Sequence, residues 1–389
     1  MTFDSKRKMM LTVSGLLVAF VLLGGVLGRS LAVEGTYSYL KLFNEVLYLV
    51  RNNYVEATDD QTLMEGAYRG MLENLDPLGE YLTATEFRRA SRDERSGPAD
   101  VGLVLSKRRG YAIVVSALEG GPGEKAGVAT GDQILTIDRR STRNLGVWEA
   151  TQALQGKAGT RVQISIIREE DSQRKDLELI RMVPGPTPLS FRLLEAGLGV
   201  FRLGGLRNGD AERVRKGLSA LRRQGADHLL LDLRSSSGSD LEEVVKVAGL
   251  FTGETRVVTV ADRLAGNRDY RAPAGAAAWT GALVVLVNGG SSGTMEILAA
   301  ALRDGAAGTL VGERTWGFGS VQRAIPLPGG DGIRLSVGKF LSPGGKEWNG
   351  TGLNPDVEQP ASSEAPGKDL QMEKGLQVLK QGTGVRKAA

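Results

Sequence analysis

A stretch without a single charged residue, Met9 to Gly28, constrains this chain more than any other feature. Twenty residues in a helix, each rising about 1.5 Å, span about 30 Å, the thickness of the hydrocarbon core of a bilayer. An uncharged run of this length predicts a transmembrane helix rather than a buried helix of a soluble domain. Lys6, Arg7 and Lys8 precede the run. They predict a cytoplasmic amino terminus, with the bulk of the chain in the periplasm or another extracytoplasmic space.

The same segment has features of a cleaved signal peptide. Ser30 and Ala32 are small residues with the spacing of a cleavage site, but the apolar run is longer than the usual h-region of about 7–15 residues. We favour a single-pass anchor in the inner or cytoplasmic membrane, with residues 9–28 as the span. A cleaved signal is the alternative.

The residue types available for catalysis are few. The chain has no Cys and one His, His228. These counts exclude a disulfide framework, a cysteine nucleophile, a Cys-ligated metal and a multi-histidine metal site within one chain. We therefore expect no metal and no organic cofactor. No motif surrounds His228, so we interpret it as a structural or surface residue, and any hydrolysis must depend on Ser, Thr, Lys, Tyr or carboxylates.

The charge pattern bears on partners. Lys and Arg number 49 against 45 Asp and Glu, which gives a net charge of +4. The basic residues are interleaved with acidic ones, and no pattern of alternating basic and aromatic residues occurs, so we expect no nucleic-acid partner.

The chain divides into five segments. They are a basic start with the anchor or signal (residues 1–32), an N-terminal helical region (33–97), a small β-rich domain (98–170), an α/β domain (171–360) and a tail with a short helix (361–389). In the second segment, helical spacing of apolar residues predicts a helix over residues 42–50 and another from Gln61 to Leu75. Pro77 forbids continuation of the second helix.

Two patterns distinguish the two domains. Short alternating runs predict strands at Tyr111 to Ser116, Gln133 to Ile137 and Arg161 to Ile167, around a helix from Val147 to Leu154. Strand and helix patterns then alternate from Leu189 to Val357, which predicts an α/β domain with a largely buried sheet.

Several motifs carry a resemblance to a known family. Residues 101–104 (VGLV), 126–132 (AGVATGD) and 155–160 (QGKAGT) look like a PDZ domain, and the surrounding motifs are residues 70–77 (GMLENLDP), 231–234 (LDLR), 285–304 (VLVNGGSSGTMEILAAALRD), 311–317 (VGERTWG) and 353–357 (LNPDV). The chain thus resembles the carboxyl-terminal processing, or tail-specific, serine proteases. The resemblance implies an α/β fold: a PDZ domain inserted between an N-terminal helical segment and a crotonase-like ββα protease core, after an N-terminal transmembrane helix.

The family's catalytic positions are changed in this chain. By resemblance, a Ser nucleophile lies three residues before the Glu that here is Glu296, a Lys base follows the Gly that here is Gly317, and a Gln orients the base. The matched residues are Gly293, Phe318 and Gln322. Nucleophile and base are both absent. Ser291 and Ser292 are the substitutes considered for the nucleophile, and we interpret them as loop and helix-capping residues.

Other residues also differ from the family motifs. The loop after Arg234 reads Ser-Ser-Ser-Gly-Ser where the family has an Asn-Pro-Gly-Gly type of turn. Gly238 is the remaining oxyanion-hole candidate. Leu78 and Gly79 follow Pro77 where the family often has His-Ser. The nearest lysines to the base position along the chain are Lys339 and Lys346. Lys339 lies in a strand-like run, where we expect its side chain to be solvated.

The PDZ resemblance implies a binding site for peptides. In such domains a peptide's terminal carboxylate binds backbone amides of a Gly-containing loop while the peptide adds to a sheet edge. The matched positions are Gly102, Leu103 and Val104, with Val147 and Ala150 on the helix that walls the groove.

We interpret the chain as a membrane-anchored, extracytoplasmic pseudoprotease that binds peptide or protein C-terminal tails and regulates proteolysis, either with an active relative or as a homo-oligomer. One alternative is an active serine-type endopeptidase with a displaced nucleophile. Another is a PDZ scaffold for envelope proteins.

Overall fold

The computed structural model describes residues 37–92, 98–169, 173–186, 188–194, 197–275, 277–361 and 368–381. The chain separates into two compact units, Met1–Tyr68 and Arg69–Ala389. Within the first unit, a helix over residues 37–53 is followed by the start of α2 (Asp60–Glu73). The helix at 37–53 exposes apolar side chains such as Tyr39 (75%) and Leu42 (58%). Across the described segments, no helix has both the length and the apolar character to cross a bilayer, and the proposed span at 9–28 lies outside them.

The β-rich domain of the second unit is one antiparallel sheet with two helices. The sheet runs β2-β3-β4-β6-β7, with β2 at its edge. The strands are β2 (Leu103–Arg108), β3 (Tyr111–Ala117), β4 (Gln133–Ile137), β6 (Arg161–Ile167) and β7 (Arg174–Ile180), joined by β5 (Arg140–Ser141), η1 (Thr142–Asn144), α4 (Pro122–Lys125) and α5 (Val147–Leu154). One apolar cluster fills the space between the sheet and α5. The expected strands and the helix are confirmed, whereas β2 and β7 were not predicted.

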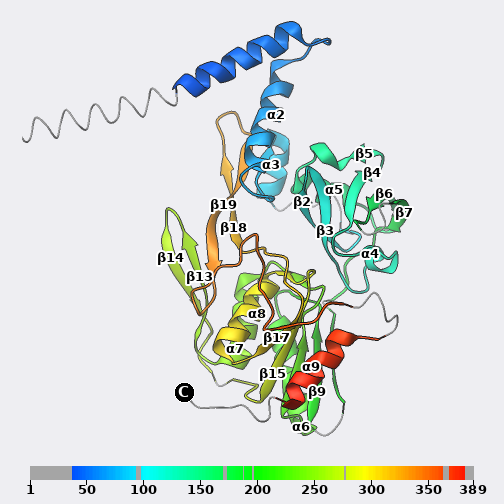
Figure 1. Cartoon of the computed structure of the whole chain (residues 1–389), viewed down its shortest axis with the longest axis vertical. Coiled ribbons are helices and arrows are strands. Elements are labelled where there is room, and N and C mark those ends of the chain that lie inside the picture. The colour runs from blue at the N-terminus through cyan, green and yellow to red at the C-terminus, as the bar shows by residue number, and fades with distance from the viewer. Residues whose placement is uncertain are drawn as a thin grey trace, which may run out of the picture. The chain divides into compact units, whose positions relative to one another are not determined.

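The α/β domain is built on a six-stranded sheet (Figure 1). Its order is β20-β17-β15-β11-β9-β8, and only β8 is antiparallel to its neighbour. The strands are β8 (Leu189–Leu193), β9 (Leu198–Leu203), β11 (His228–Asp232), β15 (Ala282–Val287), β17 (Thr309–Gly312) and β20 (Val357–Glu358). Apolar runs such as LLL in β11 are buried on both faces, as expected for a parallel sheet.

Helices cover both faces of this sheet. Leu229 and Leu231 of β11 belong to the same apolar cluster as α6 (Asp210–Arg223), α7 (Leu241–Thr252) and α8 (Thr294–Gly305). Leu230, between them, belongs to the cluster on the other face, with Leu379 of α9 (Leu370–Gln381). The alternation of side chains along the strand therefore divides the core into two layers.

Two further sheets complete the unit. An antiparallel sheet joins β1 (Glu80–Leu82), next to α3 (Ala84–Ser91), with β19 (Gly332–Leu341), β13 (Arg256–Asp262), β14 (Gly266–Arg271) and β18 (Ser320–Pro326). A short parallel sheet pairs β10 (Gly205–Leu206) with β12 (Ser237–Gly238) and β12 with β16 (Ser292–Gly293). This short sheet brings the Gly238 and Gly293 positions together.

Candidate functional site

Gly293 lies at the junction of β16 and α8, where a nucleophile is expected by resemblance. Its backbone has φ 64° and ψ −131°, a region that L side chains rarely adopt. It is the register partner of Gly238 in β12. A Cβ added to Gly293 would lie well inside van der Waals contact with the carbonyl oxygen of Gly238. The space that a side chain at position 293 needs is therefore filled by backbone.

The hydroxyls beside Gly293 differ in their partners. Ser291 is fully buried, and its Oγ donates to the carbonyl of Leu233 at 2.8 Å and accepts from the amide of Asn288 at 3.1 Å. The hydroxyls of Ser292 and Thr294 are buried and have no hydrogen-bond partner among the described residues. Ser291 is thus a structural part of the loop, and neither neighbouring hydroxyl hydrogen-bonds a base within the described ranges.

Phe318 occupies the matched position of the base. Its ring is partly buried and meets Trp316 edge to face, with ring centroids 6.3 Å apart. Lys339, the first lysine after it in the chain, is 53% exposed, and its Nζ pairs with Glu347 at 2.8 Å. The expectation that Lys339 is solvated is confirmed, and Lys346 is exposed as well. No lysine amine in the described ranges hydrogen-bonds the hydroxyl of Ser291, Ser292 or Thr294.

Glu296 holds the two positions together through their backbones. Its fully buried carboxylate accepts from the amides of Gly293 (3.2 Å), Gly317 (2.8 Å) and Phe318 (2.8 Å), and from the Thr315 hydroxyl (2.5 Å). Burial raises the pKa of this carboxyl to about 7, although the four hydrogen bonds favour its charged form. In the sequence, Glu296 served only to align the chain with the family motif, so its hydrogen bonds to the loops of positions 293 and 318 were not predicted.

The side-chain amide of Gln322 is hydrogen-bonded through its nitrogen but, within the described residues, not through its oxygen. Its Nε2 donates to the hydroxyls of Ser320 (3.1 Å) and Ser336 (2.5 Å). Its Oε1 is buried and has no partner in the part of the chain that the structure describes. Oε1 of Gln322, the atom that would accept a hydrogen bond from a lysine base, therefore has no amine donor among the described residues.

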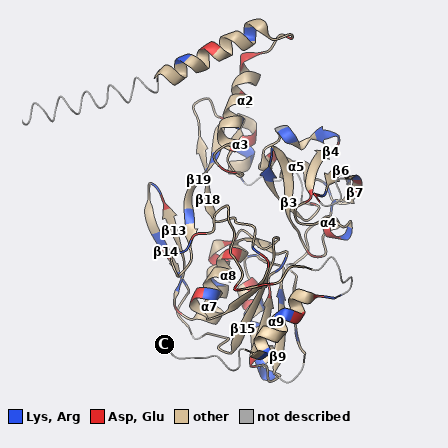
Figure 2. Ribbon diagram, viewed as in Figure 1, with Lys and Arg blue, Asp and Glu red and all other residues tan. Residues whose placement is uncertain are grey.

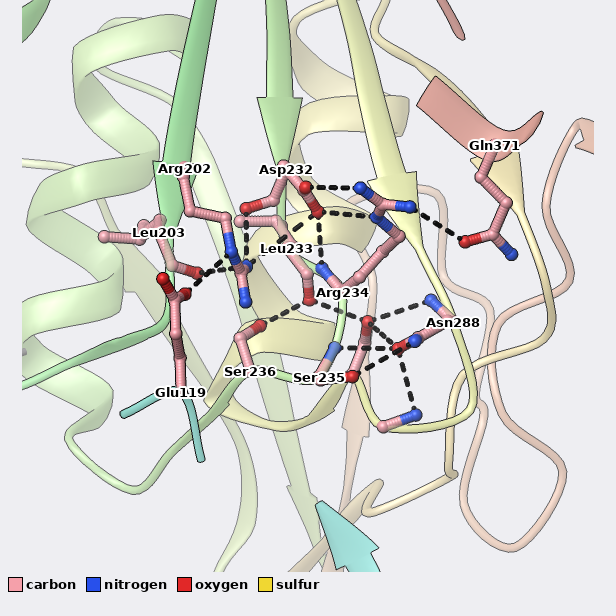
Figure 3. Close-up of polar contacts among 12 residues, drawn as sticks. Glu119, Arg202, Leu203, Asp232, Leu233, Arg234, Ser235, Ser236, Asn288 and Gln371 are labelled. Atoms are coloured by element: carbon pink, nitrogen blue, oxygen red, sulfur yellow. Dashed lines mark hydrogen bonds and ion pairs between the residues drawn. The ribbon is translucent and has the colours of Figure 1, made fainter. Parts of the chain in front are cut away.

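The loop that contains Gly238 is fixed by a polar network (Figure 3). Ser235 has a left-handed φ of 47°, and its amide donates to Oδ1 of Asn288 at 2.8 Å. The Asn288 Nδ2 donates back to the Ser235 hydroxyl at 3.2 Å. Gly238 lies between Leu206 and Gly293 as a register partner of both. The loop is therefore held against the nucleophile position rather than apart from it.

A chain of alternating charges passes beside this loop. Glu119 of the β-rich domain pairs with Arg202 at 3.0 Å, and Arg202 lies 3.8 Å from the Asp232 carboxylate. Arg234 then joins Asp232 (2.7 Å) to Asp369 (2.7 Å), just before α9. Figure 3 shows Arg202 and Arg234 on opposite sides of Asp232. The β-rich domain, the start of the Gly238 loop and the C-terminal helix are thus linked by ion pairs.

The matched peptide-binding residues are Gly102, just before β2, then Leu103 and Val104 on β2, and Val147 and Ala150 on α5. The amide of Gly102 already donates to Oδ1 of Asp100 at 2.9 Å. Leu103 and Val147 are partly buried against the domain core. Ala150 is 1% exposed and belongs to that core, so its side chain does not line a surface groove. Val104 is partly buried in the edge strand.

One contact at this domain was missed by the sequence analysis. Glu80 of β1 is 5% exposed, and its carboxylate accepts from the amide of Trp148 (3.0 Å) and from Arg334 (3.2 Å). Burial raises the pKa of the Glu80 carboxyl.

His228 contacts its neighbour in the chain: its Nδ1 lies 2.5 Å from Oδ1 of Asp227. Across the described segments, no group of three or more His, Asp and Glu side chains is arranged to hold a metal ion.

Comparisons with known proteins agree on the family. The profile of Peptidase family S41 matches residues 197–359, that of a PDZ domain residues 113–168, and that of the Activating protease CtpB N-terminal domain residues 29–85. The Carboxyl-terminal-processing protease of Synechocystis sp. is 33% identical, over 87% of this chain and 82% of that protein. The Carboxy-terminal-processing protease of Bartonella bacilliformis is 30% identical, over 94% and 86%. The chain belongs to this family of carboxy-terminal processing proteases.

The family fold is also found in a solved structure. A photosystem II D1 C-terminal processing protease matches with a TM-score of 0.69 at 29% identity, over 85% of this chain and 90% of that one. The S41 match contains Gly238, Gly293, Glu296, Phe318 and Gln322. The matched catalytic positions and the residues that hold their backbones therefore lie inside the S41 match.

Proposed function

We propose that this member of the carboxy-terminal processing protease family is a pseudoprotease that binds peptide tails and regulates proteolysis. One observation carries the proposal: Gly293 and Phe318 occupy the matched nucleophile and base positions, and the Gly238 carbonyl fills the space of a side chain at 293. A Ser-Lys mechanism needs a hydroxyl and a neutral amine within hydrogen-bond reach of each other. This site presents a backbone carbonyl and an aromatic ring instead.

Binding is supported by what remains of the site. Glu296 still ties the loops of positions 293 and 318 together, so the cleft keeps an ordered backbone. Strand β2 lies at the edge of the PDZ sheet, where an extended peptide could add as a further strand. A protein that holds a tail without cutting it would compete with, or deliver substrates to, an active relative.

The rival reading is an endopeptidase with a displaced hydroxyl. Ser292 is its best candidate, because the Ser291 hydroxyl is engaged with Leu233 and Asn288. Nothing in the described ranges activates Ser292, since its hydroxyl has no hydrogen-bond partner.

The deciding experiment is a cleavage assay. The full-length protein in phospholipid nanodiscs is incubated with unstructured peptides and the products are read by mass spectrometry, with the CtpB protease of Bacillus subtilis as a positive control. We expect intact peptides. Cleavage that is abolished by Ser292→Ala but kept by a mock substitution, Ser239→Ala in the exposed part of the loop, would overturn the pseudoprotease proposal.

We also propose that residues 9–28 anchor the protein in the cytoplasmic membrane, with the S41 core outside the cytoplasm. Support comes from the uncharged run and the basic residues before it. Carbonate extraction of membranes should leave the protein in the pellet, and amino-terminal sequencing should find residues that precede Ser30. A soluble chain that begins after Ala32 would instead show a cleaved signal.

A further inference from the structure

A cavity of about 350 Å³ lies beside the matched base position. Segments that are distant in sequence line it: residues 76–78 before the PDZ domain, residues 106–108 at the end of β2, and residues 316–318, 320 and 349–350 of the protease core. The volume is at the small end of the range for ligand sites, roughly 300–1,000 Å³. It is enough for one large side chain and the backbone that carries it. We call this cavity the Phe318 pocket.

Two departures from the family pattern meet in this pocket. Leu78 stands where the family often has His, and Phe318 stands at the position of the family Lys. Both changes replace a polar side chain by an apolar one, and Trp316 meets the Phe318 ring edge to face. Loss of catalysis alone does not require either replacement to be large and apolar. Their joint occurrence around one cavity indicates a binding surface for an apolar group.

Some charged and polar side chains at the rim of the pocket have partners, and others have none among the described residues. Lys107 is only 8% exposed and is paired with Glu73. Arg108, the next residue, is exposed and makes no ion pair with a described residue. The side-chain amide of Asn349 likewise makes no hydrogen bond within the described segments. Of the charged residues that line the pocket, Lys107 and Arg108 are basic and Asp76 is acidic. Figure 2 colours basic residues blue and acidic residues red along the ribbon. The rim thus offers a free guanidinium and a free amide to a ligand.

We propose that the Phe318 pocket binds a bulky apolar side chain of a peptide segment that carries a carboxylate close to that side chain. The apolar group lies against Phe318, Trp316 and Leu78, and the carboxylate pairs with Arg108. This inference rests on the proposed function, because it assigns a ligand to the altered catalytic cleft. It does not require a free peptide terminus, so it is separate from recognition by the PDZ domain.

The test uses two labelled peptides that differ in one residue. The first is Gly-Ser-Asp-Trp-Asp-Ser-Gly with both ends blocked, and the second has Ser in place of Trp. Binding to the full-length protein in nanodiscs is measured by fluorescence anisotropy. We expect the Trp peptide to bind about tenfold or more tightly, since only this peptide can bury a large apolar side chain in the pocket.

Variants locate the binding. Phe318→Ala should weaken binding of the Trp peptide about tenfold and leave the affinity for the Ser peptide unchanged. Arg108→Gln should weaken both peptides and reduce the salt dependence. The matched controls are Arg109→Gln, an adjacent exposed arginine that does not line the pocket, and Phe191→Ala, a partly exposed ring elsewhere in the core. Neither control should change the affinities.

The binding test and the cleavage assay can fail independently of each other. Equal affinity for the two peptides, no binding of either, or Trp-peptide binding that survives both Phe318→Ala and Trp316→Ala would each overturn this inference, while uncleaved peptides would leave the pseudoprotease proposal intact. Cleaved peptides would overturn the pseudoprotease proposal, and the affinities of the variants would still decide whether the pocket binds the Trp side chain.

Discussion

Gly293 and Phe318 share one carboxylate oxygen: the backbone amide of each donates to Oε2 of Glu296, at 3.2 and 2.8 Å. The positions that match the family's nucleophile and base are therefore joined by backbone hydrogen bonds, which do not depend on the side chains at either position. The two side chains have changed while the geometry that held them remains.

Gly293 should tolerate no side chain. Gly293→Ala adds a Cβ at a positive φ and against the Gly238 carbonyl, so we expect the protein to lose about 2–4 kcal/mol in the free energy of unfolding. Gly253 is a matched control, because it has similar angles (φ 68°, ψ −157°) and open space around its Cβ position. Gly253→Ala should cost only the conformational part, about 1–2 kcal/mol. Urea unfolding of both variants measures the difference, and equal losses would contradict contact with Gly238.

The neighbouring serines should respond differently to alanine. Ser291→Ala removes a buried hydroxyl that donates to Leu233 and accepts from Asn288, so we expect a loss of about 1–3 kcal/mol. Ser292→Ala removes a buried hydroxyl without a partner, so the change should lie within about 0.5 kcal/mol or stabilise the protein. Thermal or urea unfolding of the two variants compares them directly. A larger loss for Ser292→Ala than for Ser291→Ala would show that Ser292 has partners that the structure does not contain.

Local periodicity predicted the elements that the chain forms from adjacent residues. The strand at Gln133 to Ile137 and the helix at Val147 to Leu154 have the predicted bounds. The polar hairpin strand β14, with the sequence GNRDYR, gave no such signal. The pairing of β1 with β19 joins residues about 250 positions apart, so no local pattern could predict it.

The geometry around the matched positions could not be predicted from the sequence. Motif spacing located Gly293, Phe318 and Gln322, because a match without gaps fixes positions along the chain. The contact between Gly238 and Gly293 depends on backbone angles, which spacing does not encode. The carboxylate of Glu296 and the ion pair of Arg234 with Asp369 depend on tertiary folding in the same way.

Arg234 should hold the C-terminal helix. Its side chain is 17% exposed and donates to both Asp232 and Asp369, and its Nη1 lies 3.3 Å from Oε1 of Gln371. Arg234→Lys keeps the charge but cannot reproduce the two-sided guanidinium contact, so amide exchange in α9 should accelerate about tenfold or more, equivalent to about 1.4 kcal/mol. Arg215→Lys is the control, because Arg215 is 56% exposed and, among the described residues, pairs with Glu212 of its own helix alone. Unchanged exchange across residues 370–381 would show that apolar contacts alone hold α9.

The pKa of Glu296 predicts how stability depends on pH. Burial raises this pKa to about 7, from an ordinary value of 4.5, so the folded protein binds more protons than the unfolded chain between these values. The free energy of unfolding should therefore fall as pH rises from about 5 to 7.5, by up to about 3 kcal/mol from this group. Glu296→Gln removes the titration and should flatten that part of the profile, whereas Glu212→Gln, at an exposed carboxylate, should retain it. A wild-type stability that rises across this range, and follows the same course in Glu296→Gln, would show that the four hydrogen bonds outweigh burial and keep Glu296 charged.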